Sequence, residues 1–138
     1  MTNKELIEKA ISAKSLACTP YSKFKVGACV LAESGKTYTG ANIENSTFGA
    51  TICAERNAIM SAVLNGEKQL TKIAICSSSN DYTFPCGICR QTMAEFADDN
   101  FEIIVAKTPD DYKIYKLGEL LPYSFRGNDI KWEQLLKK

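Results

Sequence analysis

The chain of 138 residues carries 17 basic and 16 acidic residues, so its formal net charge is +1, and 45% of its residues are hydrophobic. This length predicts a single domain over residues 1–138 that buries a core without disulfide support. A near-neutral charge without a basic run argues against a nucleic-acid partner. No apolar run is long enough to span a bilayer, so we expect no membrane contact.

The N-terminal sequence and the cysteines both predict a cytoplasmic protein. Residues 1–6 lack the apolar core of a secretion signal. The six cysteines include a close Cys-x-x-Cys pair, which in a reducing compartment favours metal or redox chemistry over disulfides. Cys18, Cys29 and Cys76 lie in apolar surroundings, so we expect buried thiols without chemistry there.

The first third of the chain predicts a helix followed by a β-hairpin. Apolar residues recur at helical spacing from Thr2 or Asn3, and this helix should end before Pro20. Residues 25–32 and 37–42 alternate as strands do, and a short Gly-containing turn joins them.

The rest of the chain alternates predicted helices and strands. Thr51 is a plausible cap for a helix over residues 52–64, and Gly66 follows it in the position that ends helices. A second helix should begin near Pro85. Further predicted elements are strands at 70–77, 101–106 and 112–116, an end of the second helix at Asp98 or Asp99, a short helix at 117–121 and a terminal helix at 130–138.

Three cysteines and one glutamate form the most informative pattern. Cys53 and Glu55 lie at the start of one predicted helix, and Cys86 and Cys89 lie in the first turn of another. Residues three apart on a helix are neighbours, so Cys86 and Cys89 can bind one ion from the same face. Three sulfur ligands leave the fourth position of a tetrahedral zinc open, which is typical of a catalytic site. Glu55 is then placed to act on the water and not on the ion.

The chain has no histidine, so any zinc ligand set here is built on thiolates. Zinc with three thiolates has a net negative charge, which makes the metal a weaker acid than one bound by neutral imidazoles. Arg56 directly follows Glu55. We hypothesise that its guanidinium hydrogen-bonds the ligand sulfurs and compensates their charge.

Other interpretations of the pattern stay open at this point. A Cys-x-x-Cys pair alone is typical of half a zinc ribbon or of a redox pair, and a structural three-cysteine site completed by another ligand is also compatible. Glu55 alone could serve the helix dipole, and Arg56 could be a surface cation. The combination favours catalysis, although a soft divalent ion other than zinc fits the same ligands.

With both motifs considered, the chain resembles the small homotetrameric cytidine deaminases, a family that shares this zinc signature. The resemblance runs from about residue 6 to residue 125 and includes the tetrapeptide Cys-Ala-Glu-Arg at 53–56. It implies a three-layer α-β-α fold of the α/β class, with a five-stranded mixed sheet. The other quoted stretches are Tyr-Ser-Lys-Phe-Lys-Val-Gly-Ala at 21–28, Asn-Ile-Glu-Asn at 42–45, Pro-Cys-Gly-Ile-Cys-Arg-Gln at 85–91 and Leu-Leu-Pro at 120–122.

The resemblance implies hydrolytic deamination of free cytidine and deoxycytidine to uridine and deoxyuridine, with release of ammonia, in pyrimidine salvage. One Zn²⁺ per chain would be bound by Cys53, Cys86 and Cys89. Glu55 would take a proton from water and deliver protons to the N3 atom of the ring and to the leaving amine. A zinc enzyme that acts on another aminated ring, and a non-catalytic zinc-stabilised binding module, are the alternatives.

The resemblance also assigns the substrate contacts. Asn42 and Glu44 would hydrogen-bond the ribose hydroxyls, although polar residues are common at strand ends. Phe24 would pack on the base, a position where an aromatic residue is ordinarily core, and the Ala54 backbone would contact the polar edge of the base.

Two aromatic positions concern specificity and assembly. Phe125 corresponds to an aromatic residue that enters a neighbouring subunit's site, so the resemblance implies a homotetramer with shared pockets. Phe48 stands where the family commonly has tyrosine. Loss of that hydroxyl leaves open the preference among cytidine, deoxycytidine and modified nucleosides.

Overall fold

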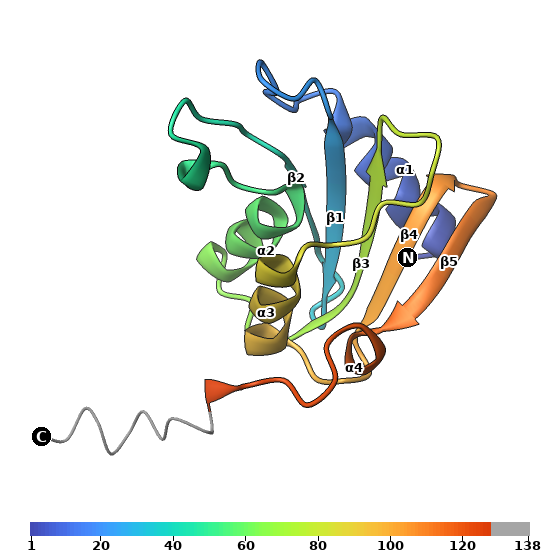
Figure 1. Ribbon diagram of the computed structural model, residues 1–138. Helices are drawn as coiled ribbons and strands as arrows, with labels where there is room; N and C mark the ends of the chain where they lie inside the picture. The colour runs from blue at the N-terminus through green and yellow to red at the C-terminus, as the bar shows by residue number, and fades with distance from the viewer. Residues whose placement is uncertain (128–138) are drawn as a thin grey trace, which may run out of the picture.

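Within residues 1–127, five strands form one mixed sheet in the order β2-β1-β3-β4-β5 (Figure 1). The computed structural model describes residues 1–127. β3 and β4 are parallel, and the other neighbouring pairs are antiparallel, so the predicted five-stranded mixed sheet and its opening hairpin are confirmed. The strands are β1 (Val26–Ala32), β2 (Thr37–Ala41), β3 (Leu70–Ser77), β4 (Glu102–Thr108) and β5 (Asp111–Lys116).

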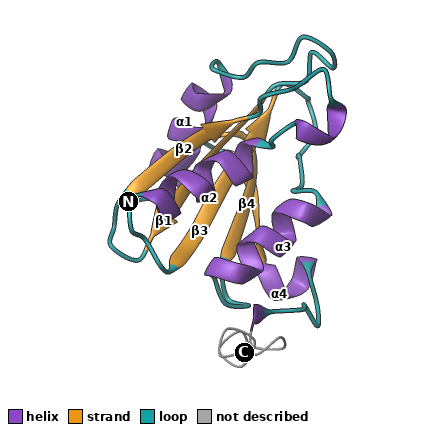
Figure 2. Ribbon diagram, turned by 90° about the vertical axis from the view of Figure 1, so that its left-hand side faces the viewer, coloured by secondary structure: helices purple, strands orange, loops and turns teal. Residues whose placement is uncertain are grey.

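Helices cover both faces of this sheet, which confirms the predicted three layers (Figure 2). α1 packs on one face, where Leu6 and Ile7 are buried with Ile104. α2 and α3 pack on the other face, where Ile59 and Met93 belong to a larger buried cluster. The helices are α1 (Asn3–Lys14), α2 (Ala54–Leu64), α3 (Gly87–Phe96) and α4 (Leu117–Leu120), and a 3-10 turn spans Phe48–Ala50. None of the helices in residues 1–127 is long and apolar enough to cross a membrane.

Local hydrogen bonds explain the helix ends that the sequence predicted. The Thr2 hydroxyl accepts from the Glu5 N–H at 3.2 Å, and the Glu5 carboxylate accepts from the Thr2 N–H at 3.3 Å, so a capping box starts α1. At the end of α2, Gly66 has a φ of +90°. The Gly66 N–H donates to the Val63 carbonyl and the Glu67 N–H to the Ala62 carbonyl, which satisfies carbonyls that the helix leaves unpaired.

Both helices that carry the cysteine motifs begin later than predicted. Thr51 is not the cap of α2, because Ile52 is held extended by two backbone hydrogen bonds to Ile43. Cys53 is the N-cap residue of α2, and Cys86 is the N-cap residue of α3.

Some boundaries differ at the other end of the chain. α3 ends at Phe96 and not at Asp98 or Asp99. In the turn that follows, the Asp98 carboxylate accepts from the Asn100 N–H and the Asp98 carbonyl accepts from the Phe101 N–H. The terminal helix predicted at 130–138 lies outside the described residues.

Gly40 on β2 allows α2 to lie unusually close to the sheet. A Cβ atom at Gly40 would come within 2.4 Å of both the Ala54 carbonyl oxygen and the Ala58 nitrogen. Both contacts are to helix backbone, which cannot move aside as a flexible side chain can. The glycine therefore determines how closely the first turn of α2, directly after Cys53, approaches the strand.

We expect Gly40→Ala to lower the free energy of unfolding by about 2 kcal/mol, because the added methyl group overpacks the contact between β2 and α2. Urea denaturation measures the change. Gly49→Ala is the matched control, since a Cβ atom at Gly49 has no heavy atom within 4 Å. Equal stability of the two variants would contradict the close-approach explanation.

Candidate metal centre

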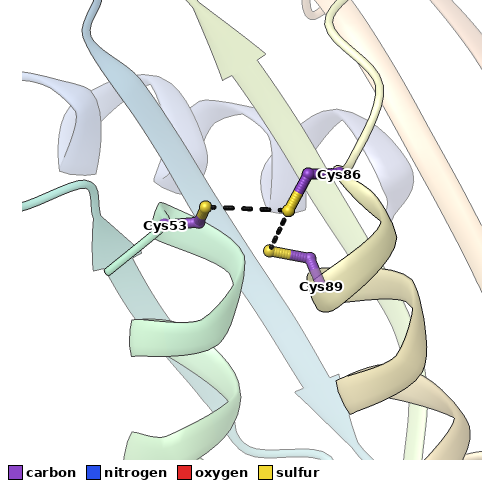
Figure 3. A group of neighbouring side chains, drawn as sticks. All are labelled: Cys53, Cys86 and Cys89. Carbon is purple, nitrogen blue, oxygen red and sulfur yellow. Dashed lines mark hydrogen bonds between the residues drawn. The ribbon is translucent and has the colours of Figure 1, made fainter. Parts of the chain in front are cut away.

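The starts of α2 and α3 bring three cysteine sulfurs together (Figure 3). Cys53 and Cys86 are the N-cap residues of the two helices, and neither side chain caps its helix. Cys89 lies in the first turn of α3. The Sγ atoms of Cys53 and Cys86 are 3.9 Å apart, and those of Cys86 and Cys89 are 3.5 Å apart. The two predicted helix starts therefore converge on one point.

The spacing of the sulfurs fits a tetrahedral metal. A zinc–sulfur distance of about 2.3 Å places neighbouring sulfurs of a tetrahedron about 3.8 Å apart, close to the two measured separations. All three sulfurs lie within 4.8 Å of one another. Within residues 1–127 no other group of three cysteine, aspartate or glutamate side chains has the proximity that metal binding requires.

Hydrogen bonds among the thiols and with Arg56 favour an ionised Cys53. The hydrogen bond with Cys89 is the main cause that lowers the pKa of Cys53 to about 5, and a hydrogen bond and the charge of Arg56 add to it. The same contact with Cys53, together with burial, raises the pKa of Cys89. Helix N-termini also favour thiolates. Of the three thiols, Cys53 is therefore the one that these contacts favour as a thiolate.

Glu55 is a buried carboxyl group beside these sulfurs. It is the second residue of α2, and only 4% of its surface is exposed. Burial raises its pKa to about 7, and the negative charge of Cys53 contributes. A carboxyl group with a pKa near neutrality can both accept and donate protons at physiological pH.

Arg56 contacts the cysteine cluster, as the sequence suggested, through the sulfur of Cys53. Its Nη2 atom donates to the Cys53 Sγ at 3.3 Å and to the Thr51 carbonyl at 3.4 Å. Its Nε is buried and has no hydrogen-bond partner among the described residues. The geometry provides the contact that charge compensation requires.

Asn42 holds the backbone around Phe24. Its amide nitrogen donates to the Phe24 carbonyl at 2.8 Å, and its amide oxygen accepts from the Val26 N–H at 2.9 Å. The side chain is largely buried. An amide has two donor hydrogens and two acceptor lone pairs, so one of each remains for a ligand.

Glu44 holds the same loop from the other side. One carboxylate oxygen accepts from the backbone N–H groups of Tyr21 at 3.0 Å and Ser22 at 3.1 Å, and the other accepts from the Ser22 hydroxyl. The hydrogen bond from the Ser22 hydroxyl is the main cause that lowers the pKa of Glu44. The Ser22 oxygen also accepts from the Phe24 N–H at 3.0 Å. Sequence reasoning missed Ser22, because a lone exposed serine has no distinguishing pattern.

The structure connects this loop to the cysteine cluster through the backbone. Ile43, between Asn42 and Glu44, pairs with Ile52, which directly precedes Cys53. Ala54 is fully buried at the first position of α2. The predicted contacts on the two segments are thus neighbours in the fold.

The remaining aromatic positions are exposed. Phe48 is 72% exposed and meets the Tyr21 ring edge-on, with centroids 5.5 Å apart. Phe125 is 58% exposed. It follows α4 on a segment that α3 holds, where the Gln91 side-chain amide donates to the Phe125 carbonyl at 2.7 Å. Within one chain, this hydrogen bond places the Phe125 backbone beside α3.

The three other cysteines divide into two groups. Cys29 and Cys76 are buried against α1, as expected, and burial raises the pKa of Cys29 to about 11. Cys18 is exposed, so the prediction of a buried thiol was wrong there. It lies in the loop after α1, and its backbone, not its side chain, pairs with Asn42 and Glu44.

Comparison with known proteins gives consistent results. Residues 1–105 match the family described as "Cytidine and deoxycytidylate deaminase zinc-binding region". The chain is 38% identical to a cytidine deaminase of Halalkalibacterium halodurans over 130 residues, which cover 94% of this chain and 98% of that protein. It is 37% identical to a cytidine deaminase of Sporosarcina psychrophila over 132 residues, covering 96% and 97%.

Solved structures of cytidine deaminases share the fold. The crystal structure from Burkholderia pseudomallei matches with a TM-score of 0.86 and 38% identity, over 91% of this chain and all of that one. The structure from Mycobacterium tuberculosis matches with a TM-score of 0.79 and 33% identity, over 91% and 98%. With a family match over most of the sequence, relatives at this identity and a thiol cluster of the right spacing, the chain belongs to the cytidine and deoxycytidylate deaminase zinc-binding family.

Proposed function

We propose that the protein deaminates free cytidine and deoxycytidine hydrolytically to uridine and deoxyuridine, with release of ammonia, as a step of pyrimidine salvage. The observation that carries the proposal is a cluster of three sulfurs at tetrahedral spacing beside a buried carboxyl group. The relatives named above are cytidine deaminases, which supports the substrate. We further propose that residues 1–138 act as one catalytic domain in the cytoplasm, where reducing conditions keep the thiols available.

Cys53, Cys86 and Cys89 would hold one Zn²⁺ per chain. Zinc at such a site supplies a Lewis acid that lets water ionise near neutral pH. The sulfur separations support this ligand set. Arg56 would withdraw charge from the Cys53 thiolate through its hydrogen bond of 3.3 Å.

Glu55 would move the protons of the reaction. It takes one proton from the attacking water and delivers it to the N3 atom of the ring. It then takes the remaining proton from the hydroxyl group added at C4 and delivers it to the amine that leaves from C4. The water oxygen replaces nitrogen at C4, so ammonia is the second product. Burial supports this role, because it holds the pKa of Glu55 at about 7, where neither protonation state is strongly favoured.

The loop at residues 19–25 would form the nucleoside-binding wall. Phe24 would pack on the base, and the Ala54 backbone would meet the polar edge of the base. Asn42 and Glu44 would reach the ribose hydroxyls with the hydrogen-bonding capacity that the loop leaves free. Phe48 would lie at the rim of this pocket, where its missing hydroxyl affects the choice among nucleosides.

We also propose that the protein is a homotetramer whose pockets are shared between subunits. Phe125 would enter the site of a neighbouring copy. Its exposure, and its location on a segment held against α3, support contact with another copy.

We expect the purified protein to contain about one zinc per chain and to lower the absorbance of a cytidine solution as it converts cytidine to uridine. Glu55→Gln should retain the zinc, but its kcat should be about a thousandfold lower. The amide has the shape of the carboxylate and cannot transfer the protons. Elemental analysis and a spectrophotometric assay with a nucleoside panel measure both properties. Zinc without turnover of any nucleoside would favour a binding module, and turnover of another aminated ring alone would redirect the substrate assignment.

Arg56→Gln should weaken zinc binding and lower kcat/KM by roughly tenfold to a hundredfold, because the Cys53 thiolate loses its charged donor. Arg56→Lys keeps the charge without the planar donor group. Its zinc affinity and kcat/KM should therefore lie between those of Arg56→Gln and the parent. Zinc titration and steady-state kinetics provide the comparison. An Arg56→Gln enzyme equal to the parent in both would show that the guanidinium has no compensating role.

Phe125→Ala should raise KM for cytidine roughly tenfold and reduce the oligomer size seen by light scattering. Ile114→Ala, which truncates an apolar residue with 42% exposure on β5, should leave both unchanged. If Phe125→Ala matches the parent in KM and in the mass of the oligomer, the proposal of a pocket shared between subunits is wrong.

A further inference from the structure

The three candidate ligands differ in what holds them in place. Cys89 is fully buried in the core between the sheet and α3. Cys53 packs on the same core and receives the hydrogen bond from Arg56. Cys86 is exposed, and the contacts described for its sulfur are those with the other two cysteines. The direction of the Cys86 side chain therefore depends on its backbone.

Arg90 controls that backbone from one turn further along α3. Its Nε donates to the carbonyl of buried Pro85 at 2.8 Å. Because a peptide unit is planar, fixing the Pro85 carbonyl also fixes the orientation of the bond that enters Cys86. Pro85 adds stiffness through its ring. The half-buried Arg90 side chain thus acts on the peptide that aims the exposed ligand.

The other end of the guanidinium reaches a second element. The Arg90 Nη1 donates to the Leu120 carbonyl, at the end of α4, at 2.8 Å. One planar group therefore connects the turn before α3 with α4. A lysine could not make both contacts, since its ammonium is a single point on a flexible chain.

We infer that Arg90 is a positioning residue for Cys86 and that it determines how tightly the centre holds its metal. The inference rests on the proposed zinc site, but not on the proposed substrate. It assigns a function to a residue whose described side-chain hydrogen bonds go to backbone carbonyls and not to a sulfur. It also explains how an exposed cysteine can be a well-placed ligand.

The opposite end of α3 provides a matched control. Arg126 Nη1 donates to the carbonyls of Ala94 and Ala97, both at 2.6 Å, and its Nη2 pairs with Asp99 at 2.8 Å. Arg90 and Arg126 therefore hold backbone carbonyls at the two ends of one helix. Replacing Arg90 or Arg126 by lysine removes the same kind of contact to backbone carbonyls. Only the contact of Arg90 is to the residue next to a candidate ligand, Cys86.

The test is competition for zinc between the full-length protein and a chromophoric chelator at fixed pH, without nucleoside. Arg90→Lys and Arg90→Met should bind zinc about tenfold more weakly than the parent. Arg126→Lys should stay within about twofold. Equal affinity of the Arg90 variants and the parent would overturn the inference, and so would an equal loss in Arg126→Lys.

A double-mutant cycle separates positioning from general destabilisation of α3. If Arg90 acts through Cys86, Arg90→Lys should cost little further affinity in a Cys86→Ser background. In a Cys53→Ser background it should still cost about tenfold. Equal costs in the two backgrounds would contradict the inference. If the parent binds zinc but does not deaminate cytidine, the proposed function is refuted and the inference about Arg90 is unaffected. If the parent binds no zinc, both the proposed function and the inference about Arg90 are refuted.

Discussion

The site depends on one constraint: two helices must begin at the same point above the sheet. Cys53 and Cys86 each occupy the position directly before the first turn of a helix. There the backbone N–H groups are unpaired and the partial positive charge favours thiolates. Close approach at Gly40 sets the depth of α2, while Pro85 and Arg90 set the entry to α3. Movement of either helix start by an ångström would separate sulfurs that now lie 3.5 to 3.9 Å apart.

Near the cysteine cluster, several side chains hold the backbone of a neighbouring segment, and some of them are also assigned to ligand binding. Asn42 and Glu44, which the family resemblance assigns to ribose, hold the backbone of the loop that carries Phe24. A substitution at either position would therefore disturb both the loop and any ligand, so loss of binding alone would not prove direct contact. Gln91 and Arg126 similarly connect α3 to the segment that carries Phe125. The C-terminal segment is thus linked to the cysteine cluster through α3. The loop that carries Phe24 is linked to the cluster through the pairing of Ile43 with Ile52.

The element order and the mixed sheet followed from apolar periodicity and turn residues, together with the family resemblance. The start of α1 and the end of α2 were predictable because Thr2 and Gly66 act on their immediate neighbours. The start of α2 was not. Thr51 has the chemistry of a cap, but Ile52 pairs with Ile43 in a distant segment and stays extended. Exposure of Cys18 was missed for the same reason, since its backbone pairing with residues 42 and 44 keeps it in a surface loop.

By itself, the sequence determined which groups are available to the centre: three thiols, one carboxyl group, one guanidinium and no imidazole. Their types and short-range spacing favour soft-metal binding beside a proton carrier, because those properties belong to the residues themselves. Only the tertiary structure decided that Glu55 is buried, so that its pKa rises to about 7, and that Arg56 reaches Cys53 and Arg90 reaches Pro85. Burial depends on packing between segments far apart in the chain, and a side chain's partner depends on where another helix begins, so neither can be deduced from local spacing.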